Sequence, residues 1–142
     1  MVGFDSRIYL IDFGLAQYFR NPATQIHTPL VRDLDIIGTV QYTSINSHMG
    51  LQQARRDDLE SLAYTLVYLL HGKVPWQGIS NRNHKRHRAA VLRKKKEICE
   101  HCSDVVLLAL KEFIQYTQSL GFDKAPDYIY LHSVLDRLYI TM

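Results

Sequence analysis

Two cysteines and two histidines have spacings that could bind a metal ion. Cys99 and Cys102 are separated by two residues, the spacing of a zinc ligand pair, and His84 or His87 could complete a set of four. The sequence contains no second cysteine pair, so the same residues also fit a turn before a helix. The turn is the favoured interpretation, and zinc is the alternative.

A run of basic residues between residues 82 and 96 could bind a phosphate-rich partner or act as a nuclear address. The run contains no acidic residue, so the rest of a chain of net charge +3 is near −5. Apolar residues at 89–92 interrupt the charges at helical spacing, which favours a solvated helix face. No aromatic residues are interleaved, so nucleic-acid binding by base stacking is not expected. The eight basic residues are Arg82, Lys85, Arg86, Arg88, Arg93, Lys94, Lys95 and Lys96.

The most clearly marked element is a helix from Arg55 to Gly72. Asp57 or Asp58 can accept the free amide hydrogens of its first turn, Gly72 can adopt the left-handed cap, and Pro75 prevents continuation. Its apolar residues do not keep to one stripe. A helix that is apolar on all sides is typical of the buried centre of a domain.

The other elements are shorter or less regular. Residues 7–11 predict one short strand, and residues 15–49 predict a long irregular loop. Residues 79–102 are partly helical by pattern, and residues 104–120 and 130–139 have helical apolar spacing. The expected fold class is therefore mainly α, with one short N-terminal strand and a buried central helix.

The composition fits one globular domain. The chain has 142 residues, of which 46% are hydrophobic and 22% are charged. No apolar run reaches the roughly 18 residues that span a bilayer, and the first residues lack the apolar core of a signal peptide. We therefore expect a protein of the cytoplasm, the nucleus or both, with no membrane partner.

Five motifs follow one another along the chain. They are Tyr9-Leu-Ile-Asp-Phe-Gly-Leu-Ala16, Gly38-Thr-Val-Gln-Tyr-Thr-Ser-Ile-Asn46, Arg55-Arg-Asp-Asp-Leu-Glu-Ser-Leu62, Pro75-Trp-Gln-Gly78 and Ala125-Pro-Asp-Tyr128. Together and in this order they closely resemble the C-terminal lobe of the casein kinase I family of serine/threonine protein kinases. Ser44-Ile45-Asn46 is the most specific, because the family carries it where most protein kinases carry Ala-Pro-Glu. The resemblance runs from about Ile8 to Tyr139 and implies one partial protein kinase domain over residues 1–142.

The resemblance assigns roles to individual residues. Asp12 matches the aspartate that binds Mg²⁺ in Mg-ATP, although a turn aspartate after a strand is the alternative. Asp58 matches the aspartate at the start of the buried central helix, with a structural cap as the alternative, and Trp76 is expected to be buried with its N–H satisfied. Residues 15–43 match the activation segment, which shapes the substrate groove. The residues assigned to this segment and its flanks are Phe13, Gly14, Gly38, Thr39, Gln41, Tyr42, Ser44 and Asn46.

The resemblance also shows which catalytic parts this sequence lacks. In the family the Gly-rich loop, the strand lysine and the catalytic loop lie upstream of Asp-Phe-Gly, and here eleven residues precede Asp12. No residue can be nominated as the catalytic base. We expect the chain alone to be an inactive pseudokinase fragment that needs no cofactor and binds protein substrates or partner proteins of casein kinase I-type kinases. The alternatives are part of a complete ATP-dependent kinase and, more weakly, a polyanion-binding module through residues 82–96.

The sequence departs from the family at two places, one that bears on binding and one within the central helix. Gln41 stands where the family has an arginine, and Ser80 and His84 lie near the positions of two lysines that bind the phosphate of a primed substrate. An amide does not replace a guanidinium fork, so no preference for primed substrates is expected. Ala63 replaces a glycine usual at that helix position, which raises helix propensity.

In the family, helices from upstream of Asp-Phe-Gly cover part of the central helix. In this chain we expect Leu59, Leu62 or Leu66 to be uncovered. An exposed apolar patch of this kind indicates a partner, self-association or aggregation. The expected monomer is marginally stable.

Overall fold

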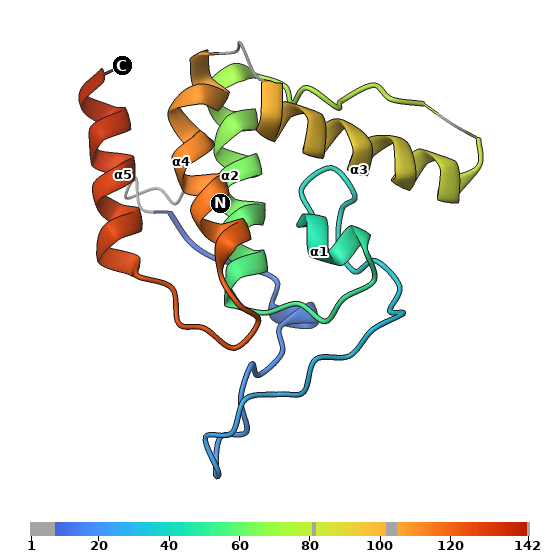
Figure 1. Ribbon diagram of the computed structural model, residues 1–142, viewed down its shortest axis with the longest axis vertical. Helices are drawn as coiled ribbons and strands as arrows, with labels where there is room; N and C mark the ends of the chain where they lie inside the picture. Colours follow the sequence, from blue (N-terminus) through green and yellow to red (C-terminus); the bar gives the residue numbers. More distant parts are fainter. Residues whose placement is uncertain (1–7, 81, 102–104, 142) are drawn as a thin grey trace.

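The computed structural model describes residues 8–80, 82–101 and 105–141, and it consists of helices joined by long irregular segments (Figure 1). The side chains of residues 98–101, 105–109 and 141 are also outside the description. The elements are the 3-10 helix η1 (Phe13–Leu15) and the α-helices α1 (Ile45–His48), α2 (Arg55–His71), α3 (His84–His101), α4 (Val105–Ser119) and α5 (Tyr128–Thr141). The mainly helical fold class is confirmed. Among the described residues, no helix is long and apolar enough to cross a bilayer.

Helix α2 lies at the centre and packs mainly against α4, while α5 packs against α4 and α3 lies beside α1 (Figure 1). Because α2 and α4 share the largest helix contact, their facing side chains form most of the core. Burying each large apolar side chain contributes about 1.5–3 kcal/mol. The buried cluster comprises Ala63, Tyr64, Val67, Val74, Trp76, Val91, Leu110, Phe113, Ile114, Leu131 and Val134.

The two ends of α2 are defined by the residues that the sequence marked. Gly72 has φ 75° and its amide donates to the carbonyl of Tyr68, so the left-handed cap is confirmed. At the other end, the carboxylate of Asp57 accepts a hydrogen bond from the amide of Ala54, at 2.9 Å. This amide precedes the helix, so the expectation that Asp57 or Asp58 accepts the free amides of the first turn is wrong in detail. The carboxylate instead fixes the chain as it enters the helix.

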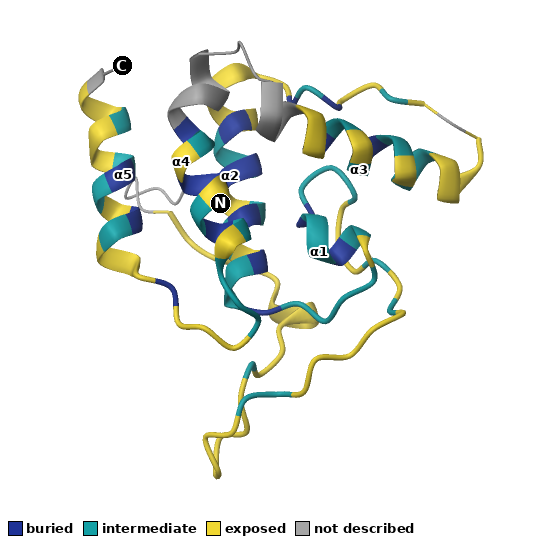
Figure 2. Cartoon of the chain, in the orientation of Figure 1, coloured by how far each residue is buried: buried dark blue, intermediate teal, exposed yellow. Residues whose placement is uncertain are grey.

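Helix α2 is buried on one side and exposed on the other (Figure 2). Leu62 is 44% exposed and Leu69 is 69% exposed, whereas Tyr64 is 1% exposed. The prediction of a helix buried all round is therefore wrong for this chain, because the described helices cover one face of α2. The expected uncovering is found at Leu62, while Leu59 and Leu66 are half-buried against the core.

The predicted strand over residues 7–11 does not form a paired strand in the described residues. Ile8 forms an isolated bridge, residues 9–12 have no regular structure, and Ile8 is 87% exposed. A strand needs a neighbour that accepts and donates its backbone hydrogen bonds over several residues, and the single bridge at Ile8 does not extend into a ladder over residues 9–11.

The long segment before α2 is mostly irregular, as predicted, but it contains the short helix α1. Ser44 caps α1 because its hydroxyl oxygen accepts a hydrogen bond from the amide of Ser47, at 3.1 Å. The sequence pattern predicts a loop for these residues, so the expectation is wrong at α1. The helices predicted at 104–120 and 130–139 correspond to α4 and α5, and α3 provides the helix expected within residues 79–102.

Candidate functional site

The Asp-Phe-Gly motif lies on the surface of the described structure. Asp12 has φ 61° and ψ 72°, in the left-handed region, and precedes the single turn of η1. Its carboxylate accepts a long hydrogen bond from the amide of Gly14, at 3.4 Å, and the side chain of Phe13 is 69% exposed. The carboxylate is therefore held against its own backbone, as in a turn.

The described residues do not fit a complete magnesium site. Mg²⁺ needs octahedral oxygen ligation, which kinases provide through protein ligands together with the nucleotide phosphates. Across the described part of the chain, no three His, Cys, Asp or Glu side chains are grouped closely enough to hold a metal ion. Asp12 is thus an isolated candidate ligand. The zinc alternative cannot be placed, because Cys102 and the side chain of Cys99 lie outside the described residues.

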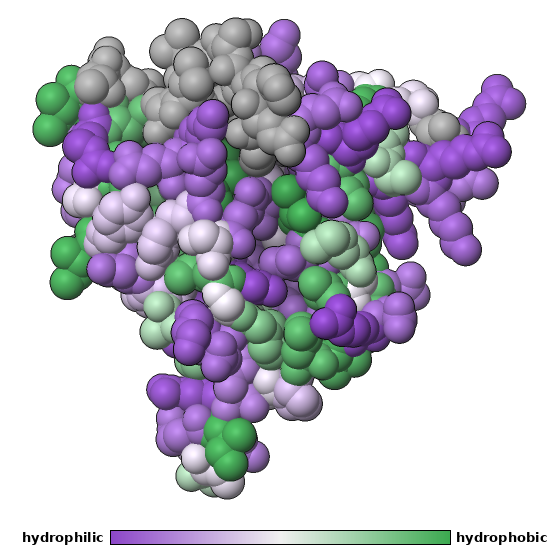
Figure 3. Space-filling view, in the orientation of Figure 1, coloured by the Kyte–Doolittle hydropathy of each residue, from purple (hydrophilic) through white to green (hydrophobic). Residues whose placement is uncertain are grey.

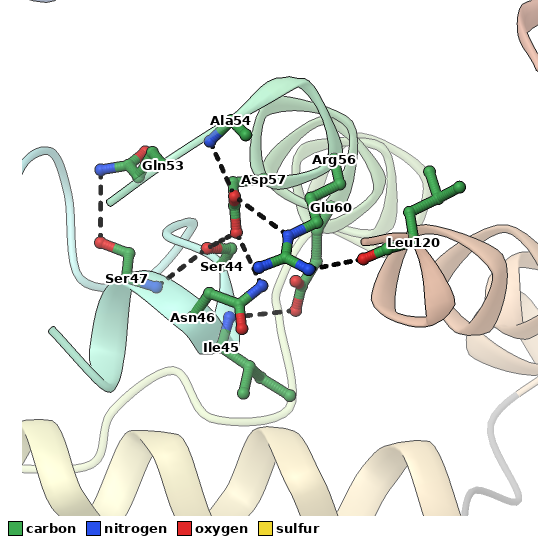
Figure 4. A network of polar contacts seen from close by, with 10 residues as sticks. All are labelled: Ser44, Ile45, Asn46, Ser47, Gln53, Ala54, Arg56, Asp57, Glu60 and Leu120. Atoms are coloured by element: carbon green, nitrogen blue, oxygen red, sulfur yellow. Dashed lines mark hydrogen bonds and ion pairs between the residues drawn. The ribbon is translucent and has the colours of Figure 1, made fainter. Parts of the chain in front are cut away.

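Residues 38–48, which we call the anchored segment, are attached to the start of α2 by the carboxylate of Asp57 (Figure 4). One oxygen of this buried carboxylate accepts hydrogen bonds from the hydroxyl of Ser44, at 2.7 Å, and from the amide nitrogen of Asn46, at 3.0 Å. The other binds the amide of Ala54 and lies 3.6 Å from Nε of Arg56. One buried charge therefore joins the Ser-Ile-Asn motif to the central helix.

Glu60, one turn further along α2, is a second buried acid that contacts the anchored segment. Its Oε1 accepts hydrogen bonds from the amide of Ile45, at 3.1 Å, from the hydroxyl of Tyr64, at 2.5 Å, and from the side chain of Gln118, at 3.1 Å. Burial raises the pKa of Glu60, and the hydrogen bonds from Tyr64 and Gln118 oppose that rise. Glu60 therefore connects α1, α2 and α4.

Arg56 extends this network to α4 (Figure 4). Its guanidinium donates to the carbonyl of Leu120 at 2.5 Å and lies beside the Asp57 carboxylate. The exposed carbonyl groups at the end of a helix are satisfied in this way by a cation, which also complements the helix dipole.

Lys95 of α3 approaches the anchored segment from the opposite side. Its side chain is fully buried, and its ammonium group donates to the carbonyls of Thr43, at 2.5 Å, and Val40, at 3.2 Å. Nε2 of His48 lies 3.3 Å from the same ammonium. The prediction that residues 82–96 form a solvated face is therefore wrong at Lys95. The signal was present, because Lys95 lies one turn after the buried Val91.

Two aromatic rings complete the surroundings of the Lys95 ammonium. It lies 4.6 Å from the ring centre of Tyr64 and 5.1 Å from that of Trp76, distances at which a cation is attracted to a ring face. The indole nitrogen of Trp76 donates to the carbonyl of Gln41 at 2.7 Å. The expectation of a buried Trp76 with a satisfied N–H is confirmed.

His48 is held in its neutral form. Burial, together with the positive charge of Lys95, lowers its pKa to about 4, although the carbonyl of Val40 acts in the opposite direction. Nε2 faces the Lys95 ammonium, a donor, at 3.3 Å and the carbonyl of Val40, an acceptor, at 3.2 Å, so each of the two neutral tautomers satisfies one of these contacts. Nδ1 is buried without a hydrogen-bond partner among the described residues.

The remaining predicted residues of the segment lie at its surface or in its turn. Gly38 has φ 93°, and the carbonyl of Thr39 accepts hydrogen bonds from the amides of Tyr42, at 2.8 Å, and Thr43, at 3.2 Å. The ring of Tyr42 packs against that of Tyr68, with centres 5.9 Å apart. A turn and a ring contact therefore give the segment its local shape.

Three polar predictions have separate outcomes. The side chain of Gln41 donates to Gln77 at 3.4 Å. Asp58 is exposed, and its carboxyl pKa is raised by partial desolvation and by the adjacent Asp57. Asp57 rather than Asp58 makes the buried contacts. Asp12 forms no hydrogen bond with the anchored segment in the described structure, so the fold does not join the two motifs directly.

The remaining basic residues of the run at 82–96 contribute to a hydrophilic surface over α3 (Figure 3). Part of this charge is paired, because Arg88 lies 3.7 Å from Asp35, and Arg93 and Lys94 each lie 3.5 Å from Glu97. Exposed pairs of this kind contribute little to stability. Polyanion binding through this face stays a prediction.

The chain is similar to casein kinase I proteins over most of its length. It is 40% identical to casein kinase I homolog 3 of Schizosaccharomyces pombe over 143 aligned positions, which cover 95% of this chain and 31% of that protein. It is 39% identical to a probable casein kinase I homolog of Encephalitozoon cuniculi, over 91% of this chain and 43% of that protein. The chain belongs to the casein kinase I family. No protein-family model matches it.

The chain spans about a quarter to two fifths of the length of its curated casein kinase I relatives. The share is 25% for casein kinase I homolog 3 of Saccharomyces cerevisiae, to which the chain is 38% identical. Its mostly helical fold is that of the C-terminal lobe of a protein kinase. The anchored segment is therefore part of a casein kinase I-type kinase region.

Proposed function

We propose that this chain provides the substrate-side surface of a casein kinase I-type protein, and that residues 38–48 bind protein substrates or partner proteins. The observation that supports the proposal is the attachment of this segment from two sides, by Asp57 and Glu60 of α2 and by Lys95 of α3. A surface held in one conformation binds with a smaller loss of conformational entropy than a mobile loop.

We also propose that the 142-residue chain does not transfer phosphate by itself. Phosphoryl transfer depends on a positioned base, bound metal ions and a cationic clamp on the phosphates. The sequence offers Asp12 as a metal ligand and no identifiable base, and the described structure gathers no metal-binding group around Asp12. Binding without catalysis is the function that these residues support.

The test measures binding and phosphate transfer on the same purified chain. We expect a fluorescein-labelled acidic serine peptide to bind saturably by anisotropy, with no incorporation of labelled phosphate from Mg-ATP. Ile129→Ala on the exposed face of α5 is the control that should leave binding unchanged. Phosphate transfer that Asp12→Asn abolishes would contradict the proposed inactivity. The absence of saturable binding would contradict the proposed surface.

Phosphorylated peptides provide a sharper test of specificity. Gln41 contacts Gln77 through an uncharged amide, so we expect equal affinity for a primed phosphopeptide and its unphosphorylated form. Gln41→Arg should create a preference of about tenfold for the phosphopeptide, because a guanidinium can bind phosphate through two hydrogen bonds. A strong preference in the wild-type chain would show that other cations bind the phosphate.

A second candidate function is favoured by the lengths of the relatives. Because the chain covers 25–43% of them, these residues could serve as one lobe of a complete ATP-dependent kinase. Asp12 would then bind Mg²⁺ together with ligands from preceding sequence. Sequencing the 5′ end of the transcript decides between the two. In-frame codons for a Gly-rich loop, a strand lysine and a catalytic loop support the kinase, and an in-frame stop codon opposes it.

The exposed face of α2 supports a further part of the proposal, which is contact with another protein or a second copy of the chain. Leu62 and Leu69 are exposed on this helix, and Leu70, which follows Leu69 in sequence, is 39% exposed. Sedimentation velocity over a roughly hundredfold concentration range measures self-association. A single monomeric boundary throughout would oppose a second copy.

A further inference from the structure

Lys95 differs from the other basic residues of α3 in what it contacts. Its neighbour Lys96 is exposed, whereas the Lys95 side chain crosses the interior and ends at the backbone of the anchored segment. The carbonyls of Val40 and Thr43 both accept from its ammonium group. One side chain therefore fixes two points of a segment that has little regular structure between them.

A second contact immobilises the residue between these two points. The carbonyl of Gln41 accepts a hydrogen bond from the indole of Trp76, and the Trp76 ring lies 5.1 Å from the Lys95 ammonium. The same ammonium lies over the ring of Tyr64 from α2. Lys95 and Trp76 thus bind three of the four carbonyls of residues 40–43, and the rings stabilise the charge that makes this possible.

Burying an ammonium group inside a protein core costs free energy. Taking a charge out of water carries a large penalty, and well-packed apolar residues often replace buried charges without loss of stability. The feature that an apolar side chain of the same length cannot supply is hydrogen-bond donation to Val40 and Thr43. The specific contribution of Lys95 is therefore to the backbone conformation of the segment rather than to filling the core.

We propose that Lys95 is a positioning residue, which holds the backbone of residues 40–43 in the conformation that a protein substrate or partner recognises. The proposal rests on the function proposed above for residues 38–48. It adds that recognition depends on a cation of α3 that does not itself contact the bound protein. The basic run on α3 accordingly contains residues of two kinds, with Lys95 acting inside the fold and its exposed neighbours acting at the surface.

The test compares Lys95→Met with Lys96→Met in the full chain. Methionine keeps most of the aliphatic stem and removes the donor, and Lys96 is the matched exposed position on the same helix. Hydrogen exchange is measured separately for residues 39–48 and for α2, and peptide affinity is measured by anisotropy. For Lys95→Met we expect about tenfold faster exchange in residues 39–48, unchanged exchange in α2 and about tenfold weaker binding. Lys96→Met should match the wild type in all three measurements.

Hydrogen exchange and peptide affinity together separate this proposal from the function on which it rests. If the wild-type chain binds no peptide, the proposed function fails. Hydrogen exchange in residues 39–48 then still tests whether Lys95 holds the backbone of residues 40–43. If Lys95→Met keeps both slow exchange and full affinity, the positioning role is overturned and the proposed function stands. Lys95→Gln, which retains hydrogen-bond donors, should recover part of the affinity and provides a second variant if the methionine chain does not fold. Unfolding of both variants would indicate a general structural role and overturn the proposal.

Discussion

Two regions of this chain that carry sequence motifs differ in their exposure and in the groups that hold them. Residues 8–16 contain the Asp-Phe-Gly motif, yet Ile8, Leu10 and Phe13 are exposed, and the Asp12 carboxylate bonds within its own turn. The anchored segment is bonded by buried side chains from two helices. Both regions carry motifs that resemble those of the family. The residues of a motif are therefore held in a fixed position where the same chain also supplies the side chains that bind them.

The largest expected effect on stability is at Asp57, which attaches the anchored segment to α2. Asp57→Ala should lower the free energy of unfolding by about 3 kcal/mol, because it removes a buried charge that accepts from Ser44, Asn46 and Ala54. Asp58→Ala, at the adjacent exposed position, should change it by less than about 1 kcal/mol. Urea unfolding of both variants measures the contrast. Equal losses would show that burial of Asp57 is not the source of its effect.

A smaller loss is expected at Trp76. Trp76→Phe keeps an aromatic ring but loses the hydrogen bond to the carbonyl of Gln41, so we expect a loss of about 2 kcal/mol. Phe13→Leu changes an exposed ring in the other region and should alter stability by no more than about 0.5 kcal/mol. Thermal unfolding followed by circular dichroism measures both. A larger loss at Phe13 would reverse the comparison.

The anchored segment should also give the protein a pH dependence. His48 has a pKa of about 4 in the folded chain, compared with an ordinary value of 6.5, so the unfolded chain binds more protons between these values. The contribution of His48 to stability is complete above pH 6.5 and is lost as the pH falls towards 4. His48→Gln should reduce the loss of stability between pH 7 and pH 5, measured by urea unfolding at each pH. Met49→Leu, at the next and exposed position, is the control, and an unchanged slope in His48→Gln would refute the assignment.

The smallest expected effect is at Asp12. Asp12→Asn keeps the side-chain oxygen that accepts from Gly14, so the free energy of unfolding should change by less than about 0.5 kcal/mol. The affinity for a substrate peptide should not change. Differential scanning calorimetry and anisotropy measure the two quantities. A loss of 2 kcal/mol or more would show that Asp12 has buried partners and would remove the contrast between the regions.

Local signals in the sequence predicted much of the fold. Gly72 and Pro75 specify the end of α2 because one adopts a left-handed conformation and the other cannot continue a helix. The apolar residues of α4 and α5 recur at helical spacing, so these two helices were also predicted from residues close together in the chain. The predicted strand at residues 7–11 does not form over its described residues, 8–11, because a strand is stabilised by a neighbour, which a local pattern cannot guarantee.

The candidate site was predicted in part. The motif Ser44-Ile45-Asn46 and the burial of Trp76 were identified from the sequence, and so was the absence of a charged side chain at Gln41. The sequence pattern predicts only a helix cap for Asp57, the acid that binds the motif, and does not distinguish Glu60 from an exposed acid. Carboxylates and lysines are normally exposed, so composition and spacing favour the surface for them unless partners are known.

The sequence by itself determined the family, the helical class and the ends of the central helix, because these depend on residues close together in the chain. Only the tertiary structure decided that Asp57 and Lys95 are buried while Asp58 and Lys96, their immediate neighbours, are exposed. The physical reason is that a charge is buried where distant groups can pair with it. The carbonyl of Thr43 is brought to Lys95 by the fold, across a long stretch of sequence.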